Sequence, residues 1–298
     1  MWRNLFGTLK FIFNHPATRN HKWSALMRFT GWQIQSRIFR KPVIYPFVEK
    51  SKLIVQGGMT GATGNIYTGL HEFEEMMFLL HFLRPGDLFV DAGANIGSFT
   101  ILASAVAGAG SISFEPVPET FRHLKNNVAV NGVESLVELH NAGVGMEKGK
   151  LSFTSGLDTM NHVVSAKGDS GNGIIEVDII TLDEVLGNRI PRLVKIDTEG
   201  FEMAVLQGGK SVFPTSTMMG IIAELNGACQ RYGVMEKDIH EWIIGQGFTA
   251  VLYDPFKRSL STKSSYNPHG NTIYIKNETE VASRLLTARK IRLLHQDI

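Results

Sequence analysis

The chain has 298 residues but only one cysteine, Cys229, and it has no long apolar run. A single cysteine excludes an intramolecular disulfide and a zinc site built from several thiolates. Such low cysteine use is typical of a reducing compartment. No stretch approaches the roughly 18 apolar residues that span a bilayer, and the apolar residues near the N-terminus are too few for a signal peptide. We therefore expect a soluble, cytoplasmic protein.

Acidic side chains are absent from residues 1–48, which contain eight lysines and arginines interleaved with aromatic residues. The whole chain has a formal net charge of +2, so the remainder has a net charge of −6. Basic and aromatic side chains together are typical of a helix on a membrane surface, and equally of a helix that packs its aromatics on a neighbouring domain. Both interpretations stay open for residues 1–41. Nucleic acid is not expected as a partner, because no binding module is recognisable.

Strand and helix patterns alternate along most of the chain after residue 70. Helices are predicted around residues 76–83, 98–107, 118–130 and 201–207. Strands are predicted over residues 88–91, 111–115, 137–141, 193–197, 221–225, 249–253 and 272–275. Alternation of this kind predicts an α/β fold, a mostly parallel sheet of seven strands with helices on both faces. Residues 143–180 depart from it and are interpreted as inserted strands.

The N-terminal segment has a different pattern. Residues 1–41 are predicted as two helices separated at Pro16, and Pro42 and Pro46 indicate an extended linker. Residues 57–69 are rich in Gly, Thr and Asn, which predicts a flexible loop. We therefore divide the chain into three parts. They are a basic, aromatic-rich helical extension and linker over 1–65, a main domain over 66–280, and a C-terminal helix over 281–298.

The sharpest local signal is FVDAGANIG, residues 89–97, between the first strand of the main domain and a helix. Gly93 and Gly97 permit a tight turn, and the helix that follows directs its free N–H groups at the same place. Asp91 ends the strand, where it could hold an ammonium group. Glu115 ends the next strand, where a carboxylate accepts hydrogen bonds from ribose hydroxyls. These features predict a nucleoside cofactor, with a plain turn beside a surface glutamate as the alternative.

Asn95 bears on which cofactor is bound. A dinucleotide turn, G-x-G-x-x-G, has its middle glycine where this chain has Asn95. A side chain there would crowd a pyrophosphate, but it would leave room for a smaller methionine tail. A nicotinamide-dependent oxidoreductase is therefore the weaker alternative. A non-catalytic binding or scaffold protein that kept the fold is a second alternative.

Five motifs resemble, in order and spacing, those of the FkbM family of methyltransferases. They are DAGANIG at 91–97, FEP at 114–116, TLD at 181–183, LVKIDTEGFEMAVLQGG at 193–209 and IIAELN at 221–226. The resemblance covers about residues 70–255 and implies a class I Rossmann-like methyltransferase that uses S-adenosylmethionine. It further implies O-methylation of a sugar, glycan or related small molecule, as in polysaccharide biosynthesis. The cofactor-binding residues that it implies are Glu72, Asp91, Gly93, Asn95, Gly97 and Glu115.

Candidate catalytic residues follow from the chemistry of a hydroxyl, which is a poor nucleophile at neutral pH and needs a nearby base. Asp197 and Glu199 lie at the carboxyl end of a predicted strand, where ligands bind in open α/β sheets. Asp197 is predicted as base or substrate anchor, with Glu199 next. A buried ion-pair network with Lys195 is the alternative for this cluster. His162, in the inserted region, is a further candidate base.

Three residues are predicted on the acceptor side of the pocket. Tyr67 would stack on a sugar ring if the loop over 57–69 folds over the pocket, although a surface crossover is an equal alternative for that loop. His71 follows the loop and is another candidate base. Glu224 ends an apolar strand and adds a further acid.

No metal site is predicted. Asp158, His162, Asp197 and Glu224 could supply ligands, but their spacing matches no metal-binding motif. The basic, aromatic N-terminal extension would suit a lipid-linked glycan acceptor at a membrane, which we state as an expectation.

Overall fold

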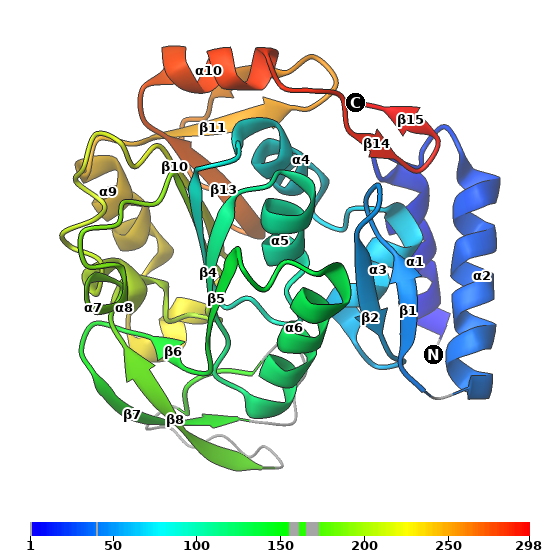
Figure 1. Ribbon diagram of the computed structural model, residues 1–298, viewed down its shortest axis with the longest axis horizontal. Helices are drawn as coiled ribbons and strands as arrows, with labels where there is room; N and C mark the ends of the chain where they lie inside the picture. The colour runs from blue at the N-terminus through cyan, green and yellow to red at the C-terminus, as the bar shows by residue number, and fades with distance from the viewer. Residues whose placement is uncertain (1, 40, 155–160, 165–172) are drawn as a thin grey trace.

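The computed structural model describes residues 2–39, 41–154, 161–164 and 173–298. Its centre is an eight-stranded sheet in the order β12-β11-β13-β10-β9-β3-β4-β5 (Figure 1). The strands are β3 (Leu88–Ala92), β4 (Gly110–Phe114), β5 (Val137–His140), β9 (Leu193–Ile196), β10 (Gly220–Leu225), β11 (Thr249–Asp254), β12 (Ser259–Thr262) and β13 (Gly270–Ile275). Strands β5, β4, β3, β9 and β10 are parallel, whereas β13 runs antiparallel to both β10 and β11. The class I Rossmann-like fold is confirmed, with β12 as an unpredicted hairpin strand at one edge.

Helices cover both faces of this sheet, as the alternating pattern predicted. On one face lie α4 (Phe73–Phe82), α5 (Ser98–Ile101) and α6 (Pro118–Asn131), and on the other lie α7 (Leu182–Leu186), α8 (Glu202–Gln207) and α9 (Glu236–Gly245) (Figure 1). Helix α5 continues into a π-helical turn over Leu102–Val106, and a short 3-10 helix covers Ala228–Tyr232. Alternate residues of each strand point to opposite faces of the sheet and pack in two separate hydrophobic cores, one on each face. Phe89 and Ile222 pack toward α4, and Val90, Ile221 and Ala223 pack toward α8 and α9.

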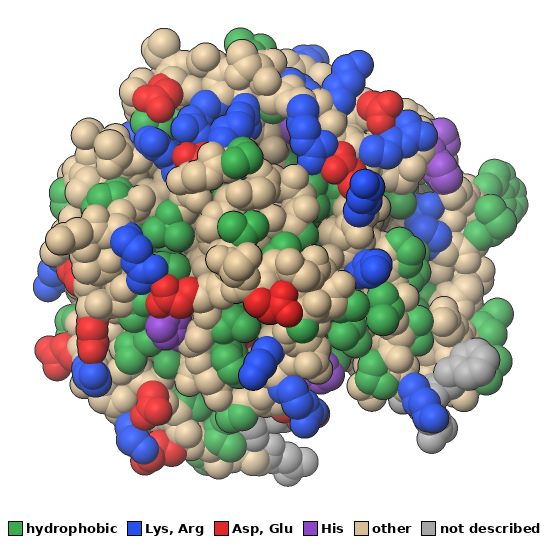
Figure 2. Space-filling model, viewed as in Figure 1, with side chains coloured by type: hydrophobic (Ala, Val, Ile, Leu, Met, Phe, Trp, Pro, Cys, Tyr) green, Lys and Arg blue, Asp and Glu red, His purple; other side chains and the backbone are tan. Residues whose placement is uncertain are grey.

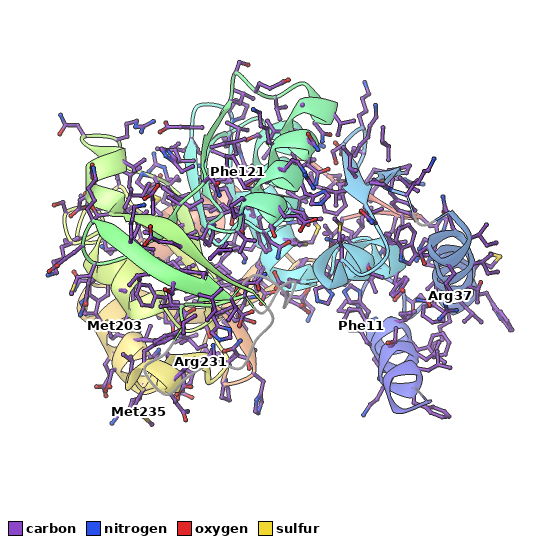
Figure 3. All side chains as sticks on the ribbon, turned by 90° about the horizontal axis from the view of Figure 1, so that it is seen from below. Phe11, Arg37, Phe121, Met203, Arg231 and Met235 are labelled. Atoms are coloured by element: carbon purple, nitrogen blue, oxygen red, sulfur yellow. The ribbon has the colours of Figure 1, made fainter. Side chains whose placement is uncertain are left out.

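The N-terminal helices are confirmed as α1 (Trp2–Asn14) and α2 (Lys22–Phe39). They lie at one end of the molecule, beside a hairpin of β1 (Val43–Pro46) and β2 (Lys52–Val55) (Figure 1). The segment predicted as an extended linker is therefore the first strand of a hairpin. Figure 2 shows hydrophobic side chains along the outer edge of α2, and Figure 3 shows Phe11 and Arg37 on the two helices.

The flexible loop predicted over 57–69 is wrong, because most of it is helix α3 (Thr60–Thr68). Ala62 and Ile66 lie one turn apart, and both are buried in a cluster with residues of α2. Gly69 then ends the helix with a φ of 85°. The glycines and threonines of this segment have a low helix propensity, so the sequence predicted a loop despite the helical spacing of Ala62 and Ile66. Packing against α2 outweighs that low propensity.

Two further segments complete the fold. The inserted strands predicted between 143 and 180 form a separate sheet of β6 (Gly143–Val144), β7 (Gly149–Thr154) and β8 (Ile174–Ile180). A helix over 281–298 is wrong in its extent. Helix α10 covers Glu278–Leu286, and a hairpin of β14 (Arg292–Leu293) and β15 (Gln296–Asp297) follows because Ile291 and Ile298 exchange two backbone hydrogen bonds.

Within the described residues, no helix is both long and apolar enough to cross a membrane. This agrees with the absence of long apolar runs in the sequence.

Asn127 of α6 links the N-terminal hairpin to the bend after β3. Its side chain is fully buried, with Oδ1 accepting a hydrogen bond from the Ile54 N–H at 2.6 Å. Its Nδ2 donates to the carbonyl oxygen of Ile96 at 2.8 Å. One amide group therefore satisfies a backbone group in each of two segments that flank the site.

We expect Asn127→Ala to lower the free energy of unfolding by about 2 kcal/mol, because it leaves a buried N–H and a buried carbonyl without partners. Urea denaturation of the whole protein measures this change. The control is Asn126→Ala on the same helix, where the side chain is exposed. Equal losses in the two variants would show that Asn127 has no linking role.

Candidate functional site

A cavity of about 340 Å³ opens at the carboxyl ends of β3, β4, β9 and β10. Its volume lies within the roughly 300–1,000 Å³ of small-molecule sites. The order of the strands reverses between β3 and β9, which is where ligands bind in such sheets. The sequence-predicted residues that line the cavity are His71, Glu72, Asp91, Gly93, Asn95, Glu115, Asp197, Glu199 and Glu224.

The bend after β3 has the tight geometry that its glycines predict. Gly93 and Gly97 have φ values of 86° and 92°, and Asn95 between them has a φ of 52°. A Cβ atom on Gly93 would lie 1.8 Å from the carbonyl oxygen of Asp197, so only glycine fits there. Gly97 shapes the bend without lining the cavity, because it begins α5 and packs closely against Leu124.

Asp91 is 1% exposed at the carboxyl end of β3. Its Oδ2 accepts a hydrogen bond from the Thr100 hydroxyl at 2.7 Å, while its Oδ1 has no partner among the described residues. Burial raises the pKa of Asp91 to about 6, although the positive charge of Lys195 opposes the shift. A buried carboxylate oxygen without a partner is costly, so this atom suits a cationic or hydrogen-donating ligand group.

Glu115 faces the same cavity from the end of β4. Its two carboxylate oxygens accept hydrogen bonds from the backbone N–H groups of Asn95 and Val117, at 3.0 and 2.9 Å. Burial raises the pKa of Glu115 to about 7. Each oxygen keeps a further lone pair, so Glu115 can still accept a hydrogen bond from a ligand hydroxyl. Glu72, directly before α4, adds a third acid to the cavity wall.

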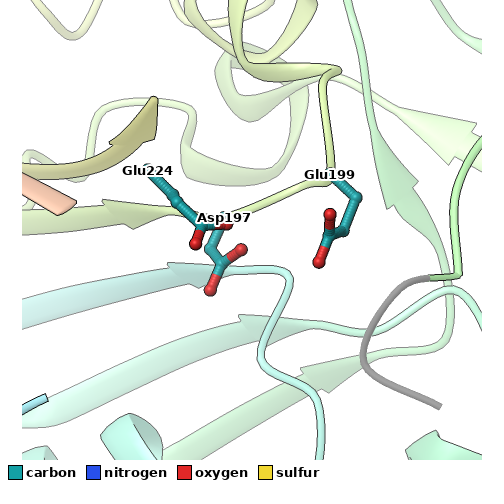
Figure 4. Close-up of side chains that lie close together, drawn as sticks. All are labelled: Asp197, Glu199 and Glu224. Carbon is teal, nitrogen blue, oxygen red and sulfur yellow. The ribbon is translucent and has the colours of Figure 1, made fainter. Parts of the chain in front are cut away.

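Asp197, Glu199 and Glu224 form an acidic cluster at the ends of β9 and β10 (Figure 4). One oxygen from each lies within 4.8 Å of the others, which is close enough for a shared metal ion. However, the ammonium group of Lys195 already lies 2.5 Å from Oδ2 of Asp197. The ion pair of Lys195 with Asp197, which was the alternative interpretation of this cluster, is therefore present.

The acids of this cluster differ in proton affinity because of their neighbours. Burial would raise the pKa of Asp197, but the charge of Lys195 and the hydrogen bonds from Glu224 and Lys195 together outweigh burial and lower it. Burial and the negative charge of Asp197 raise the pKa of Glu224 to about 10, and the two carboxyl groups share a hydrogen bond. Burial also favours the neutral form of Lys195, yet the charges of Asp197, Glu72 and Asp91 prevail and raise its pKa. Near neutral pH, Asp197 is thus ionised and Glu224 is protonated.

Glu199 occupies the turn between β9 and α8 with a φ of 53°. Burial, followed by the negative charges of Asp197 and Glu202, raises the pKa of Glu199 to about 7. Glu202 holds the turn in place, since its Oε1 accepts hydrogen bonds from the backbone N–H groups of Thr198 and Gly200. A strained turn held by a dedicated acid is a common feature of functional loops.

Two predicted residues lie away from the cavity. The ring of Tyr67 is 5% exposed, packs edge-on against Phe29, and its hydroxyl accepts a hydrogen bond from Gln33 at 2.7 Å. It therefore belongs to the N-terminal helical cluster and lines a second cavity there rather than this one, and its stacking on a sugar ring stays a prediction. His162 is buried in the inserted region, where its backbone pairs with that of Thr154. It does not line the cavity among the described residues, and its role as a base stays a prediction.

His71 does line the cavity, and it is exposed. Asp158 lies outside the described residues. The sequence interpretation missed Asn65, which is 4% exposed and lines the cavity from α3. Its Oδ1 accepts a hydrogen bond from the backbone N–H of His71, and its Nδ2 donates to the hydroxyl of Ser98. Its segment was interpreted as a loop, so nothing suggested that the side chain would be held at a site.

The fold and the cavity together define a class I Rossmann-like protein with a small-molecule site at the switch point of its sheet. Residues 91–249, a little over half of the chain, match the methyltransferase FkbM domain family. The chain belongs to this family.

Several characterised proteins are similar to the chain. Methyltransferase 1 of Beauveria bassiana is 33% identical over 150 residues, which cover 42% of this chain and 59% of that protein. The hexuronic acid methyltransferase AglP of Haloferax volcanii is 30% identical over 142 residues, covering 46% and 56% of the two chains. The chain thus spans less than two thirds of the length of either relative. The crystal structure of the FkbM methyltransferase from Methylobacillus flagellatus KT is 13% identical, with a TM-score of 0.44 and coverage of 85% and 60%.

We expect Gly93→Ala to lower the free energy of unfolding by more than about 1 kcal/mol, because alanine is strained at this φ and its Cβ meets a backbone carbonyl. Thermal or urea denaturation measures the loss. Gly31→Ala is the control, since Gly31 lies within α2 with no atom near its missing Cβ. That variant should gain about 0.5–1 kcal/mol, and a similar gain at Gly93 would contradict the tight bend.

Proposed function

We propose that the protein transfers a methyl group from S-adenosylmethionine to a hydroxyl group of a sugar, glycan or related metabolite. One observation carries the proposal: a single cavity joins a nucleoside-type bend, with Asp91 and Glu115, to the acidic cluster of Asp197, Glu199 and Glu224. Membership of the FkbM family supports the methyl transfer. The name of the Haloferax volcanii relative, a hexuronic acid methyltransferase, supports a sugar acceptor.

The residues present fit the cofactor. The partnerless Oδ1 of Asp91 would accept a hydrogen bond from its ammonium group, and the free lone pairs of Glu115 would accept from its ribose hydroxyls. When bound, S-adenosylmethionine supplies an electrophilic methyl group whose leaving group is a neutral thioether. Proton chemistry is therefore needed only at the acceptor.

On the acceptor side, Glu199 is proposed as the base. A catalytic base must be ionised near neutral pH and must still bind a proton well. The pKa of Glu199, about 7, meets both requirements. Asp197 is a weaker base because of Lys195, and it fits the role of an anchor that accepts a hydrogen bond from a second hydroxyl. Lys195 positions Asp197 and keeps it ionised. Protonated Glu224 donates to Asp197 and holds the carboxylate in place.

The nicotinamide alternative has less support. Asn95 occupies the position of the middle glycine, and its side-chain oxygen accepts a hydrogen bond from the Ile96 N–H at 2.7 Å. The family match also favours a methyl donor. A scaffold protein without turnover would still bind the cofactor, so binding and turnover are tested separately.

We expect S-adenosylhomocysteine and S-adenosylmethionine to bind and NAD to show no binding by isothermal titration calorimetry. Affinity should fall as the pH is lowered through about 6, because Asp91 then takes up a proton and loses the charge that pairs with the ammonium. Asp91→Asn should weaken binding by about tenfold to a hundredfold, from the loss of a charged hydrogen bond. Exposed Glu119→Gln is the matched control. Unchanged binding in Asp91→Asn would remove the cofactor assignment.

We expect methyl-labelled S-adenosylmethionine to label a hydroxyl-bearing component of polysaccharide and glycolipid extracts. The rate at limiting acceptor should fall as the pH drops through about 7, because Glu199 must be ionised to act as base. Glu199→Gln should lower this rate by about 10²–10⁴ and abolish its acidic limb. An unaltered pH profile in the variant would assign the base elsewhere, and cofactor binding without labelling would favour the scaffold.

A further inference from the structure

Helix α2 has an exposed apolar stripe in addition to its buried face. Trp23, Met27, Ile34 and Ile38 are 80%, 67%, 59% and 66% exposed. Their spacings of four, seven and four residues place them on one side of an α-helix. The opposite side, which includes Phe29, is buried against α1 and α3. The stripe therefore follows the outer edge of the molecule, where Figure 2 shows hydrophobic side chains.

The charges of the N-terminal segment that contains this stripe have one sign. Residues 1–48 contain no acidic side chain. Among the side chains of this segment that the structure describes, the exposed basic ones are Lys10, Arg19, Lys22, Arg37 and Lys41. None of them forms an ion pair with an acid of the described residues, so their charges are available to an external anion. Tryptophan beside lysine and arginine is the composition of helices that lie in the headgroup region of a bilayer.

The stripe is continuous with the candidate site. A second cavity, of about 970 Å³, lies between α1, α2 and α3 and is lined largely by apolar side chains, including Phe11 and Trp32. Figure 3 shows Phe11 and Arg37 on the two helices that border it. Ile34 belongs both to the stripe and to this cavity, and His71 lines both this cavity and the site. These shared residues place the second cavity between the outer face of α2 and the site.

We propose that α2 docks the protein on an anionic lipid bilayer, with the stripe in the headgroup–acyl boundary and the basic side chains on lipid phosphates. A bilayer accounts for the apolar stripe and for the uniform positive charge together. A second copy of the chain would place equal positive charges opposite one another. This proposal rests on the proposed function and adds to it a class of acceptor. A lipid-linked acceptor in the bilayer would reach the site through the second cavity.

Vesicle flotation of the full chain tests the docking. The protein should float with vesicles of phosphatidylcholine and phosphatidylglycerol, float less with pure phosphatidylcholine, and be released as salt screens the charges. Trp23→Gln/Ile34→Gln/Ile38→Gln should lower vesicle partitioning by at least about tenfold, since each side chain loses its burial in lipid. The matched control is Ile244→Gln/Leu252→Gln/Leu286→Gln, which removes three exposed apolar side chains from other elements. Far-UV circular dichroism and thermal denaturation verify that both variants keep the fold.

Two results would overturn the docking. One is the absence of flotation with anionic vesicles, in particular if light scattering shows a dimer that the α2 variant separates. The other is equal flotation of the α2 variant and its control. Flotation needs neither cofactor nor turnover, so its failure is distinct from a failure of the proposed methyl transfer.

Discussion

The buried ammonium group of Lys195 holds the acidic edge of the sheet together. It lies 2.5 Å from Asp197 and 4.7 Å from the centre of the Phe99 ring, and its charge also stabilises Asp91 and Glu72. Without a cation there, burial would drive Asp91 and Asp197 toward their neutral forms. With it, Asp197 stays ionised while Glu224 keeps a proton. Asp197 and Glu224, although they are neighbours, therefore differ in protonation state.

The proposed cofactor and acceptor sides of the cavity are joined by direct backbone contact. Gly93 of the bend lies so close to the carbonyl oxygen of Asp197 that no side chain fits between them. Asn95 of the same bend donates its N–H to Glu115, and Glu202 fixes the turn that holds Glu199. A displacement of one loop must therefore move the other. Such contact would keep the bend after β3 and the acidic cluster at a fixed separation.

The sequence was sufficient to predict many of the residues that line the cavity, because these residues lie at the carboxyl ends of strands. Parallel strands bring their carboxyl ends to one edge, so Asp91, Glu115 and Asp197 were expected to meet there. For residues on helices or in the inserted region, the sequence did not indicate which side chains would reach the cavity. Tyr67 and Asn65 lie two residues apart on α3, yet one ring is buried against α2 while the other side chain lines the cavity. Which way each points depends on packing against a distant helix.

The pattern of apolar residues, glycines and acids was enough to predict the sheet, its helices and the bend after β3, because these depend on local spacing and backbone conformation. The helix over Thr60–Thr68 and the hairpin at the end of the chain needed the three-dimensional arrangement. So did the proposal that Glu199 rather than Asp197 is the base. Proton affinity depends on burial and on charges from other elements, such as Lys195 and Glu202. Those neighbours come together only when the strands and loops pack, so no property of a short segment can reveal them.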